Sequence, residues 1–429
     1  MIAKILLAIS IPVFADEAYY YIWTLHPQLS YFDHPAMVSW LISLGQPLSH
    51  VSTQLGLRFL FILCSTLTLY FWILIFKKNQ FSEKQTLFFL ILLILNPLFG
   101  VGSILATPDV PLVLFWTMSY WAYLHLFDAN TARQKIFWYS LLGICLGLGF
   151  CSKYHIVLFL LAGTVDVLVY KKYRQISWAY VSATIISGLI FCLPVLIWNA
   201  QNEWASFTYQ LRHGFGKSYY DPSWTLSFVV GQIFILNPFV FGSFMRSKPK
   251  ASNWWFAISG FGFFLLSSLK AVVEANWPIT AQTHATAFAT EKMSGALFKK
   301  NLFFWGGFYL ITIGLLLSPY KDKILKNQYN STQTSTIAFL VDKYKPLYGS
   351  SYQIASLLSW QTKSFIPKLN GLSRYDFFDT LSESTPTEKT IYVLKHFDSI
   401  WPDKYDIYKK TFLERFDDLG IELYQLSYE

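Results

Sequence analysis

Residues 54–76 read QLGLRFLFILCSTLTLYFWILIF, and this stretch decides the class of fold. A helix that crosses a bilayer needs about 20 predominantly apolar residues. Similar apolar runs follow one another from the start of the chain to about residue 319. We therefore expect an all-α polytopic membrane domain over residues 1–319 with about eleven membrane-spanning helices. The expected spans are residues 2–15, 54–76, 86–106, 109–127, 136–151, 155–170, 178–198, 224–245, 253–270, 278–292 and 301–318.

The composition of the chain supports this prediction. Of 429 residues, 54% are hydrophobic and only 14% are charged, against roughly 25% charged in an ordinary soluble domain. A water-soluble globular protein is therefore nearly excluded, and the abundance of aromatic and aliphatic residues excludes an intrinsically disordered chain. Four cysteines lie in or beside apolar runs, without the spacing of metal ligands or disulfides. They are Cys64, Cys145, Cys151 and Cys192.

The charged residues are sorted between alternate loops. Short loops rich in Lys and Arg stay in the cytoplasm, and one set of loops is basic, with Lys77, Lys171 and Arg174 as examples. The loops between them carry carboxylates. We therefore expect a cytoplasmic N-terminus and an acidic outer side. The net charge of +9 then reflects topology, and we expect no nucleic acid as a partner.

The hydrophobic runs stop after residue 319, and the last part of the chain has a different pattern. Alternating segments at residues 336–341 and 390–394 predict strands, so we expect a small extramembrane α/β domain over residues 320–429. An odd number of spans places this domain on the periplasmic or extracytoplasmic side. The short first span, residues 2–15, also resembles a cleavable signal peptide.

Residues 16–45 read DEAYYYIWTLHPQLSYFDHPAMVSWLISLG, and they form the first outer loop. One interpretation is an amphipathic interfacial helix with aromatics such as Tyr20 at the membrane surface. That interpretation leaves the carboxylates unexplained. The alternative makes Asp16 or Glu17 a general base at the end of a helix, where a hydroxyl arrives from water and a lipid from the bilayer.

Two further acidic positions follow on the same side. Asp33 and His34 form a polar group in which His34 either binds an anionic leaving group or caps a turn. Asp109 lies in a very short loop next to the apolar core. It is a second candidate for the reaction centre or the N-cap of the following helix, and both interpretations can hold together.

The remaining outer loops contribute cations and amides. Lys153 and Tyr154 lie at one membrane depth, and the loop over residues 198–224 adds Arg212 and His213. Cations beside glycines suit phosphate-like anions, although a solvated loop explains them equally well. Glu274 and Asn276 come at the start of the tenth span, where Asn276 is also a candidate N-cap. Because five outer loops bring such groups to one face, we infer a reaction centre at the outer membrane boundary.

Several of these motifs together resemble a known family. In this order the chain contains DEAYYYIW, YFDHPAMVSWL, TPDVPLVLFW, SKYHIVL, PVLIWNAQNEWASFTYQLRHG and EANWP. The order and spacing of these motifs are similar to those in bacterial members of the dolichyl-phosphate-mannose protein mannosyltransferase-like superfamily. The resemblance covers about residues 10–290. This group includes lipid A aminoarabinose transferases and lipopolysaccharide galacturonosyltransferases, membrane enzymes of the GT-C fold that take sugar from a polyprenyl-phosphate donor. SSYQIASLLSW and SRYDFFD, within residues 350–379, also resemble this subgroup.

The resemblance implies an inverting glycosyltransferase of the inner membrane. Asp16 is the expected base, with Glu17 beside it, and Asp109 matches the acidic position of the second outer loop. The implied partners are a polyprenyl-phosphate-linked sugar donor, a lipid A, lipopolysaccharide or other glycan acceptor, and membrane lipids. The candidates for binding the donor phosphate are His34, Lys153, Tyr154, Arg212 and His213. The candidates for binding substrate are Asp33, Tyr20, Glu274 and Asn276.

No cofactor and no metal are expected, because side chains can stabilise a phosphomonoester leaving group. Three other functions stay open: a transporter or flippase of a lipid-linked sugar, a protein O-glycosyltransferase, and a silent scaffold. A transporter should carry ionisable groups within its spans. Here they lie at span ends, with Asp166 as the main interior exception.

Overall fold

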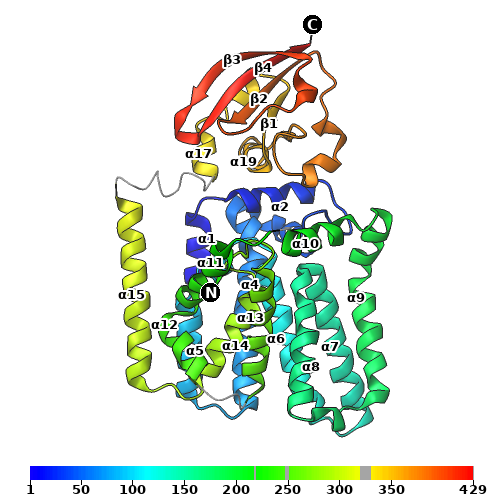
Figure 1. The fold of residues 1–429 in the computed structure, drawn as a ribbon, viewed down its shortest axis with the longest axis vertical. Coiled ribbons are helices and arrows are strands. Elements are labelled where there is room, and N and C mark those ends of the chain that lie inside the picture. Colours follow the sequence, from blue (N-terminus) through cyan, green and yellow to red (C-terminus); the bar gives the residue numbers. More distant parts are fainter. Residues whose placement is uncertain (217–218, 247–250, 319–329, 429) are drawn as a thin grey trace. The chain divides into compact units, whose positions relative to one another are not determined.

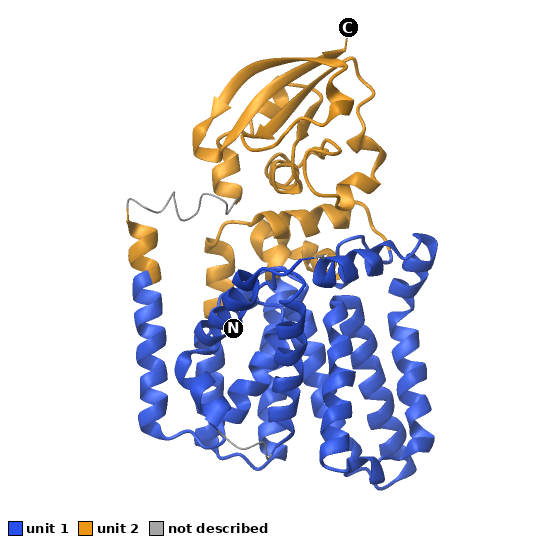
Figure 2. Ribbon diagram, viewed as in Figure 1, with its two compact units in different colours: residues 1, 29–38, 59–311 blue, residues 2–28, 39–58, 312–429 orange. Residues whose placement is uncertain are grey.

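The structure is a computed structural model of the 429-residue chain, and it describes all residues except 217–218, 247–250, 319–329 and 429. The described residues form two compact units (Figure 2). Unit 1 comprises Met1, Leu29–Val38 and Phe59–Ile311, and unit 2 comprises Ile2–Gln28, Ser39–Arg58 and Thr312–Glu429. The domain boundary expected between residues 319 and 320 lies outside the described residues. Unit 2 thus joins C-terminal residues with two segments from the beginning of the chain.

Unit 1 is built from helices (Figure 1). All eleven stretches expected to span the membrane contain a helix, so the all-α prediction for this part is confirmed. The helices that lie wholly or mostly in unit 1 are α4 (Thr53–Lys78), α5 (Glu83–Leu95), α6 (Asp109–Leu126), α7 (Ala132–Ser152), α8 (Leu158–Val169), α9 (Val181–Gln201), α10 (Ala205–Phe215), α11 (Pro222–Leu236), α12 (Pro238–Arg246), α13 (Ser252–Ser267), α14 (Ile279–Thr290) and α15 (Gly295–Leu317).

Not all of these helices are long enough to cross a bilayer alone. Four helical segments among the described residues are both long and apolar enough: α4, α7, Trp178–Gln201 and α15. Helices α11 and α12 would make a fifth span if counted together, but they are bent by 101° at Asn237. The count of eleven spans therefore stays a prediction.

Helix α14 shows that a helix can be buried within unit 1 although it is short and contains polar residues. Its twelve residues are all buried, although it contains Thr, Gln and His. Both ring nitrogens of His284 have partners inside unit 1: Trp116 Nε1 donates to Nε2 at 2.8 Å, and Nδ1 bonds to Asn253 Oδ1 at 2.8 Å. A helix enclosed by other helices needs partners for its polar side chains more than it needs an apolar surface.

Local sequence signals fix the starts of several helices. Ser82 caps α5, because its hydroxyl accepts from the Gln85 backbone and Gln85 Oε1 accepts from the Ser82 backbone at 2.7 Å. Thr131 and Gln134 repeat this reciprocal arrangement at the start of α7. Such capping boxes satisfy N–H groups that the first helical turn leaves unpaired.

Unit 2 contains helices and one sheet of four strands. The sheet has the order β1-β2-β4-β3, in which β1 pairs parallel to β2 and the other pairs are antiparallel. The small C-terminal α/β structure that we expected is therefore present. The strands are β1 (Leu347–Gly349), β2 (Thr390–His396), β3 (Tyr408–Phe416) and β4 (Ile421–Tyr428). The helices are α1 (Ile2–Ser10), α2 (Ala15–Leu25), α3 (Met37–Gly45), α17 (Ser331–Ser335), α18 (Leu340–Lys343) and α19 (Tyr352–Thr362).

One of the two strand predictions is wrong. Residues 390–394 lie in β2, but residues 336–341 form a turn that leads into α18. The buried residues there are Ile337, Leu340 and Val341. Their spacing of three and four residues is the helical one, and it outweighs the partial alternation of the segment.

Candidate active site

The acidic pair of the first outer loop lies in the first turn of α2, within unit 2. Asp16 is exposed, and its Oδ1 accepts a hydrogen bond of 2.9 Å from the phenol of Tyr352 on α19. Burial, and then the negative charge of Asp16, raise the pKa of Tyr352 well above its usual value. The phenol therefore stays protonated and donates to the carboxylate.

Glu17 has a different environment from its neighbour. Arg58 Nε donates to Glu17 Oε1 at 2.7 Å, and Arg58 Nη2 donates to Oε2 at 2.5 Å. Both side chains are almost fully buried. Oε2 also accepts from the backbone N–H of Phe14 at 3.2 Å, which ties the carboxylate to the start of α2. Glu17 is therefore held in place as an ion-paired anion.

A C-terminal segment of unit 2 supports Tyr352 from the other side. The guanidinium carbon of Arg374 lies 5.0 Å from the centre of the Tyr352 ring. The buried ammonium of Lys368 donates to the backbone oxygen of Arg374 and to Asp376 Oδ2, each at 2.8 Å, and also to Asp379. One buried cation thus organises the loop that carries Arg374.

Aromatic contacts join α2 to the same loop. The Tyr19 hydroxyl accepts from the backbone N–H of Phe377 at 2.8 Å, and the Tyr19 ring lies 4.7 Å from the ring of Tyr352. Tyr20, expected to bind substrate, is buried and packs edge-on against Trp23 with ring centres 4.9 Å apart. Its ring therefore contributes to the packing of α2.

Within unit 1, three predicted residues from three separate loops meet. Lys153 Nζ donates to Asp109 Oδ1 at 2.7 Å, and Asn276 Nδ2 donates to Asp109 Oδ2 at 2.6 Å. Asp109 and Lys153 are both buried. Asp109 starts α6, where the helix dipole also favours a negative charge. We call Asp109, Lys153 and Asn276 the Asp109 cluster.

Histidines gather beside this cluster. His155 lies within electrostatic range of Lys153, His34 and His213. The ring of Trp277 lies 5.7 Å from the ring of His155 and 5.3 Å from that of His213, between centres. Of the residues expected to bind phosphate, His213 lies beside Trp277, and Lys153 and His34 lie near His155.

Asp33 is buried, and a hydrogen bond to its backbone helps to hold it in position. Gln210 Nε2, from α10, donates to the Asp33 backbone oxygen at 2.6 Å. The Phe32 and Tyr209 rings pack at 4.7 Å beside this bond. These contacts join the Asp33–His34 turn to the loop helix that carries His213.

Three other candidates lie apart from the Asp109 cluster. The Tyr154 hydroxyl is 2.8 Å from Ser206 Oγ and ties the end of α7 to α10. Arg212 and Glu274 are exposed, and neither has an ion-pair partner within the described part of the chain. Nor do the described residues include a group of three or more His, Cys, Asp or Glu side chains that could hold a metal ion.

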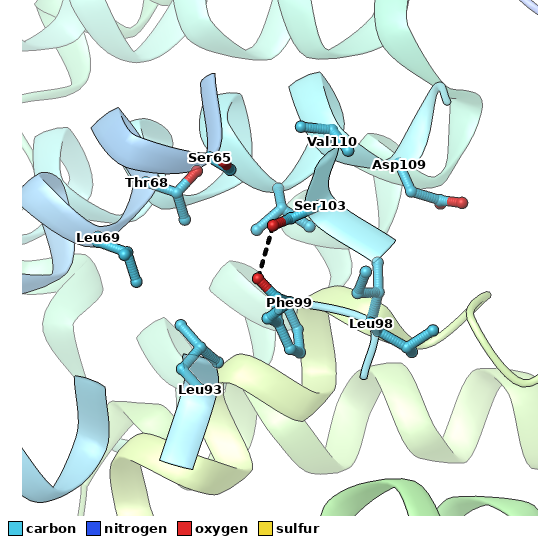
Figure 3. Close-up of a pocket in the computed structure, with 11 residues that line it drawn as sticks. Ser65, Thr68, Leu69, Leu93, Leu98, Phe99, Ser103, Asp109 and Val110 are labelled. Carbon is cyan, nitrogen blue, oxygen red and sulfur yellow. Dashed lines mark hydrogen bonds between the residues drawn. The ribbon is translucent and has the colours of Figure 1, made fainter. Parts of the chain in front are cut away.

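A small cavity lies behind Asp109, between α4, α6 and the turn after α5 (Figure 3). Its volume is about 20 Å³, which is room for a single water. In Figure 3 the Asp109 carboxylate points away from Ser65 and Thr68. The hydroxyls of Ser65 and Thr68 donate to carbonyls of their own helix, and most of the other lining residues are apolar.

Comparisons with known proteins place this arrangement in context. Residues 33–198 match the family model described as dolichyl-phosphate-mannose-protein mannosyltransferase. The chain is 24% identical over 301 residues to the lipid A galacturonosyltransferase RgtD of Rhizobium johnstonii, covering 64% of the chain and 59% of that relative. It is 26% identical over 169 residues to the undecaprenyl phosphate-alpha-4-amino-4-deoxy-L-arabinose arabinosyl transferase of Pseudomonas aeruginosa, covering 39% of the chain and 30% of that relative.

A solved structure extends the likeness to the whole fold. ArnT from Cupriavidus metallidurans, crystallised with undecaprenyl phosphate, superposes with a TM-score of 0.70 at 12% identity, covering 99% of this chain and 96% of ArnT. The resemblance indicated by the motifs is confirmed. The chain shares its fold with ArnT, and its sequence is similar to transferases that act on lipid A or use undecaprenyl phosphate sugars.

The residues that hold the acidic pair were not among those expected from the sequence. Arg58 is a lone cation within an apolar stretch, residues 54–76, and a charge at such a position is a signal of function or pairing. Tyr352 and Arg374 lie within residues 350–379, which resemble the subgroup, but no local spacing connects them to Asp16. Their role depends on contacts between residues more than 300 positions apart.

Proposed function

We propose that the chain is an inverting glycosyltransferase. It moves a sugar from a polyprenyl-phosphate donor to a hydroxyl or phosphate of lipid A, lipopolysaccharide or another cell-envelope glycan. The observation that carries the proposal is the exposed Asp16 carboxylate, which accepts a hydrogen bond from the half-buried Tyr352 phenol. Asp16 lies in the motif DEAYYYIW, which resembles transferases of this kind. The names of the relatives support the choice of a lipid-linked donor and a lipid A acceptor.

Asp16 acts as the general base in this proposal. Its carboxylate takes the proton of the acceptor hydroxyl, and the acceptor oxygen attacks the anomeric carbon from the face opposite the phosphate. The bond between the anomeric carbon and the phosphate oxygen breaks, and polyprenyl phosphate leaves with the electron pair. A positioned base of this type contributes about 10² to 10⁴ in rate.

Glu17 and Asp109 have supporting roles. Glu17 is paired with Arg58 through both oxygens, so it positions the first turn of α2 and with it Asp16. Asp109 holds Lys153 through one oxygen and Asn276 through the other. A lysine held in this way presents its remaining N–H groups to an anion without first losing side-chain freedom.

The proposed partner of Lys153 is the phosphate of the donor. His34 and His213 are the neighbouring candidates, and Arg212, exposed on α10, stays a prediction as a phosphate-binding residue. Tyr154 positions α10 through Ser206. Asp33, Glu274 and Tyr20 stay predictions as substrate-binding residues. The reaction as proposed needs neither a metal nor another cofactor.

The proposed topology has eleven spans, a cytoplasmic N-terminus and an extracytoplasmic C-terminal domain. It places the acidic loops and the reaction at the outer face of the inner membrane. The basic loops after α4, α8 and α14 then face the cytoplasm, as the charge rule requires.

The test is mass spectrometry of lipid A and lipopolysaccharide core from cells with and without the gene. We expect a mass difference of a hexose, uronic acid or amino sugar. Cells that carry Asp16→Asn should lack this mass. Cells that carry Asp221→Asn should keep it, because Asp221 is the N-cap of α11 and Asn is also a favourable N-cap residue. Identical spectra with and without the gene would reject lipid A and lipopolysaccharide as acceptors.

A further inference from the structure

A second polar cavity lies at the opposite end of unit 1 from the outer loops, next to the basic loops. Its volume is about 350 Å³, within the range of small-ligand sites. Its walls come from the turn between α4 and α5, from α6, from the end of α8, and from the residues at the start of α13 and after α14. The residues that carry the argument are Lys172, Asn253 and Glu291.

Lys172, which lines this cavity, bonds to the interior carboxylate of Asp166, a group that the proposed reaction does not use. Asp166 is fully buried, and its Oδ2 accepts from Tyr123 at 2.6 Å and from Lys172 at 2.7 Å. Ionisable groups at membrane depth are costly, and they usually mark a functional site. Here the buried carboxylate fixes the position of a cation at the edge of the cavity.

Lys172 is further constrained by its other neighbours. Its ammonium donates to Ser252 Oγ at 2.9 Å and lies between 5.2 and 5.5 Å from the centres of the Tyr123, Phe127 and Tyr170 rings. Two of its three N–H groups are used by Asp166 and Ser252. The third suits an anionic oxygen that enters the cavity.

Asn253 adds a second donor. Trp116 donates to His284 Nε2, so the proton of this ring is on Nδ1, and Nδ1 donates to Asn253 Oδ1. This bond fixes the amide orientation. Within the described part of the chain, no hydrogen-bond partner is recorded for Asn253 Nδ2, and that nitrogen is a donor at the cavity wall.

Glu291 supplies the opposite charge. It lines the same cavity just after α14. No cation among the described residues forms an ion pair with its carboxylate. Since Asp166 already neutralises Lys172, this extra carboxylate makes the cavity suited to a ligand that brings a positive group together with an anionic one.

We propose that this cavity binds a phosphodiester that carries a primary ammonium group, as in the headgroup of phosphatidylethanolamine. The phosphate oxygens accept from Lys172 and Asn253, and the ammonium donates to Glu291. The Phe81, Tyr120 and Tyr170 side chains enclose the ligand. This site is separate from the proposed sugar transfer and does not depend on it.

The test uses native mass spectrometry of the purified full-length protein after exchange into micelles with defined lipids. Wild type should retain phosphatidylethanolamine about tenfold more strongly than phosphatidylglycerol or phosphatidylcholine. Glu291→Gln should abolish this preference. Glu83→Gln, which removes an exposed carboxylate from the first turn of α5, should keep it. Thermal unfolding checks that both variants are folded.

A second arm identifies the source of the headgroup and needs only wild-type protein. Soluble glycerophosphoethanolamine and glycerophosphoglycerol compete with the retained lipid. If only glycerophosphoethanolamine displaces the lipid, the site recognises the headgroup whether it comes from a lipid or from a soluble compound. If neither compound displaces the lipid, the site is specific for the bilayer lipid. Equal retention of all three lipids by wild type, or an unchanged preference in Glu291→Gln, would overturn the proposal.

Discussion

The Glu17 carboxylate accepts hydrogen bonds from two nitrogens of the Arg58 guanidinium, at 2.7 Å and 2.5 Å. Neither side chain is more than 1% exposed. Arg58 Nη1 donates to the backbone oxygens of Ala8 and Ile11, both at 2.7 Å, and Nη2 also donates to the backbone oxygen of Pro12 at 2.8 Å. Arg58 therefore joins the end of α1, the start of α2 and α4, and it leaves Asp16 as the accessible carboxylate of the pair.

The first prediction concerns this buried ion pair. Arg58→Ala should destabilise the protein by about 3 kcal/mol or more, because it leaves a buried, uncompensated carboxylate. Thermal and denaturant unfolding in detergent measure this change. Lys410→Ala, which breaks the exposed pair with Asp406, should cost at most about 1 kcal/mol. Equal effects of the two substitutions would contradict the buried, bidentate pair.

The second prediction concerns the phenol that holds the base. Tyr352→Phe removes a hydrogen bond that stabilises the charged form of Asp16, so the carboxylate should take up a proton more readily. The acid limb of the pH–rate profile should move to higher pH, and kcat at neutral pH should fall by about tenfold, as for loss of one charge-assisted hydrogen bond. The measurement is kcat against pH for both proteins. A lower rate with an unmoved acid limb would assign Tyr352 a packing role only.

The third prediction concerns the Asp109 cluster. Lys153→Met should lower kcat by about 10² or more, since it removes a cation from the proposed leaving phosphate. Lys153→Arg should recover part of the rate because it keeps the charge. Lys270→Met, which removes an exposed lysine from the loop that also carries Asn276, should have little effect. If Lys153→Met raises KM for the donor but leaves kcat unchanged, the role of Lys153 is binding of the ground state.

The fourth prediction concerns metal dependence. Because the proposed leaving group is stabilised by side chains, sugar transfer should be insensitive to EDTA. Initial rates before and after chelation and desalting provide the measurement. Loss of activity that one divalent metal restores would show that the proposed mechanism is incomplete.

Much of the fold could be predicted because it depends on local patterns. Apolar runs located every helix of unit 1 that was expected, and the basic end of α4, Lys77 and Lys78, lies beside the predicted loop. Lys299 and Lys300, expected in a loop, lie within α15. The pattern could not show that α14 is enclosed by other helices, because the partners of its polar side chains, such as Trp116 and Asn253 for His284, are distant in sequence. The helical spacing of Ile337, Leu340 and Val341 was present in the sequence but was read as alternation.

The part of the candidate site that could be predicted consists of polar residues at the ends of apolar runs, in the loops expected on the outer side. Asp109, Lys153 and Asn276 were all chosen from separate loops, and they form direct contacts. Arg58 and Tyr352 were not chosen, because their partners Glu17 and Asp16 are distant in sequence. No periodicity encodes such a pairing, and only the packing of unit 2 brings these residues together.

The most direct test of the proposed function is sugar transfer by purified protein from a mixed pool of polyprenyl-phosphate sugars to extracted lipopolysaccharide. Wild type should release polyprenyl phosphate and modify the acceptor in equal amounts. Asp16→Asn should reduce both products by about 10² to 10⁴ while the protein keeps its unfolding temperature, and Asp221→Asn should match wild type. Transfer at the wild-type rate by Asp16→Asn would contradict the assignment of the base, and lipid movement without transfer by wild type would contradict the proposed reaction.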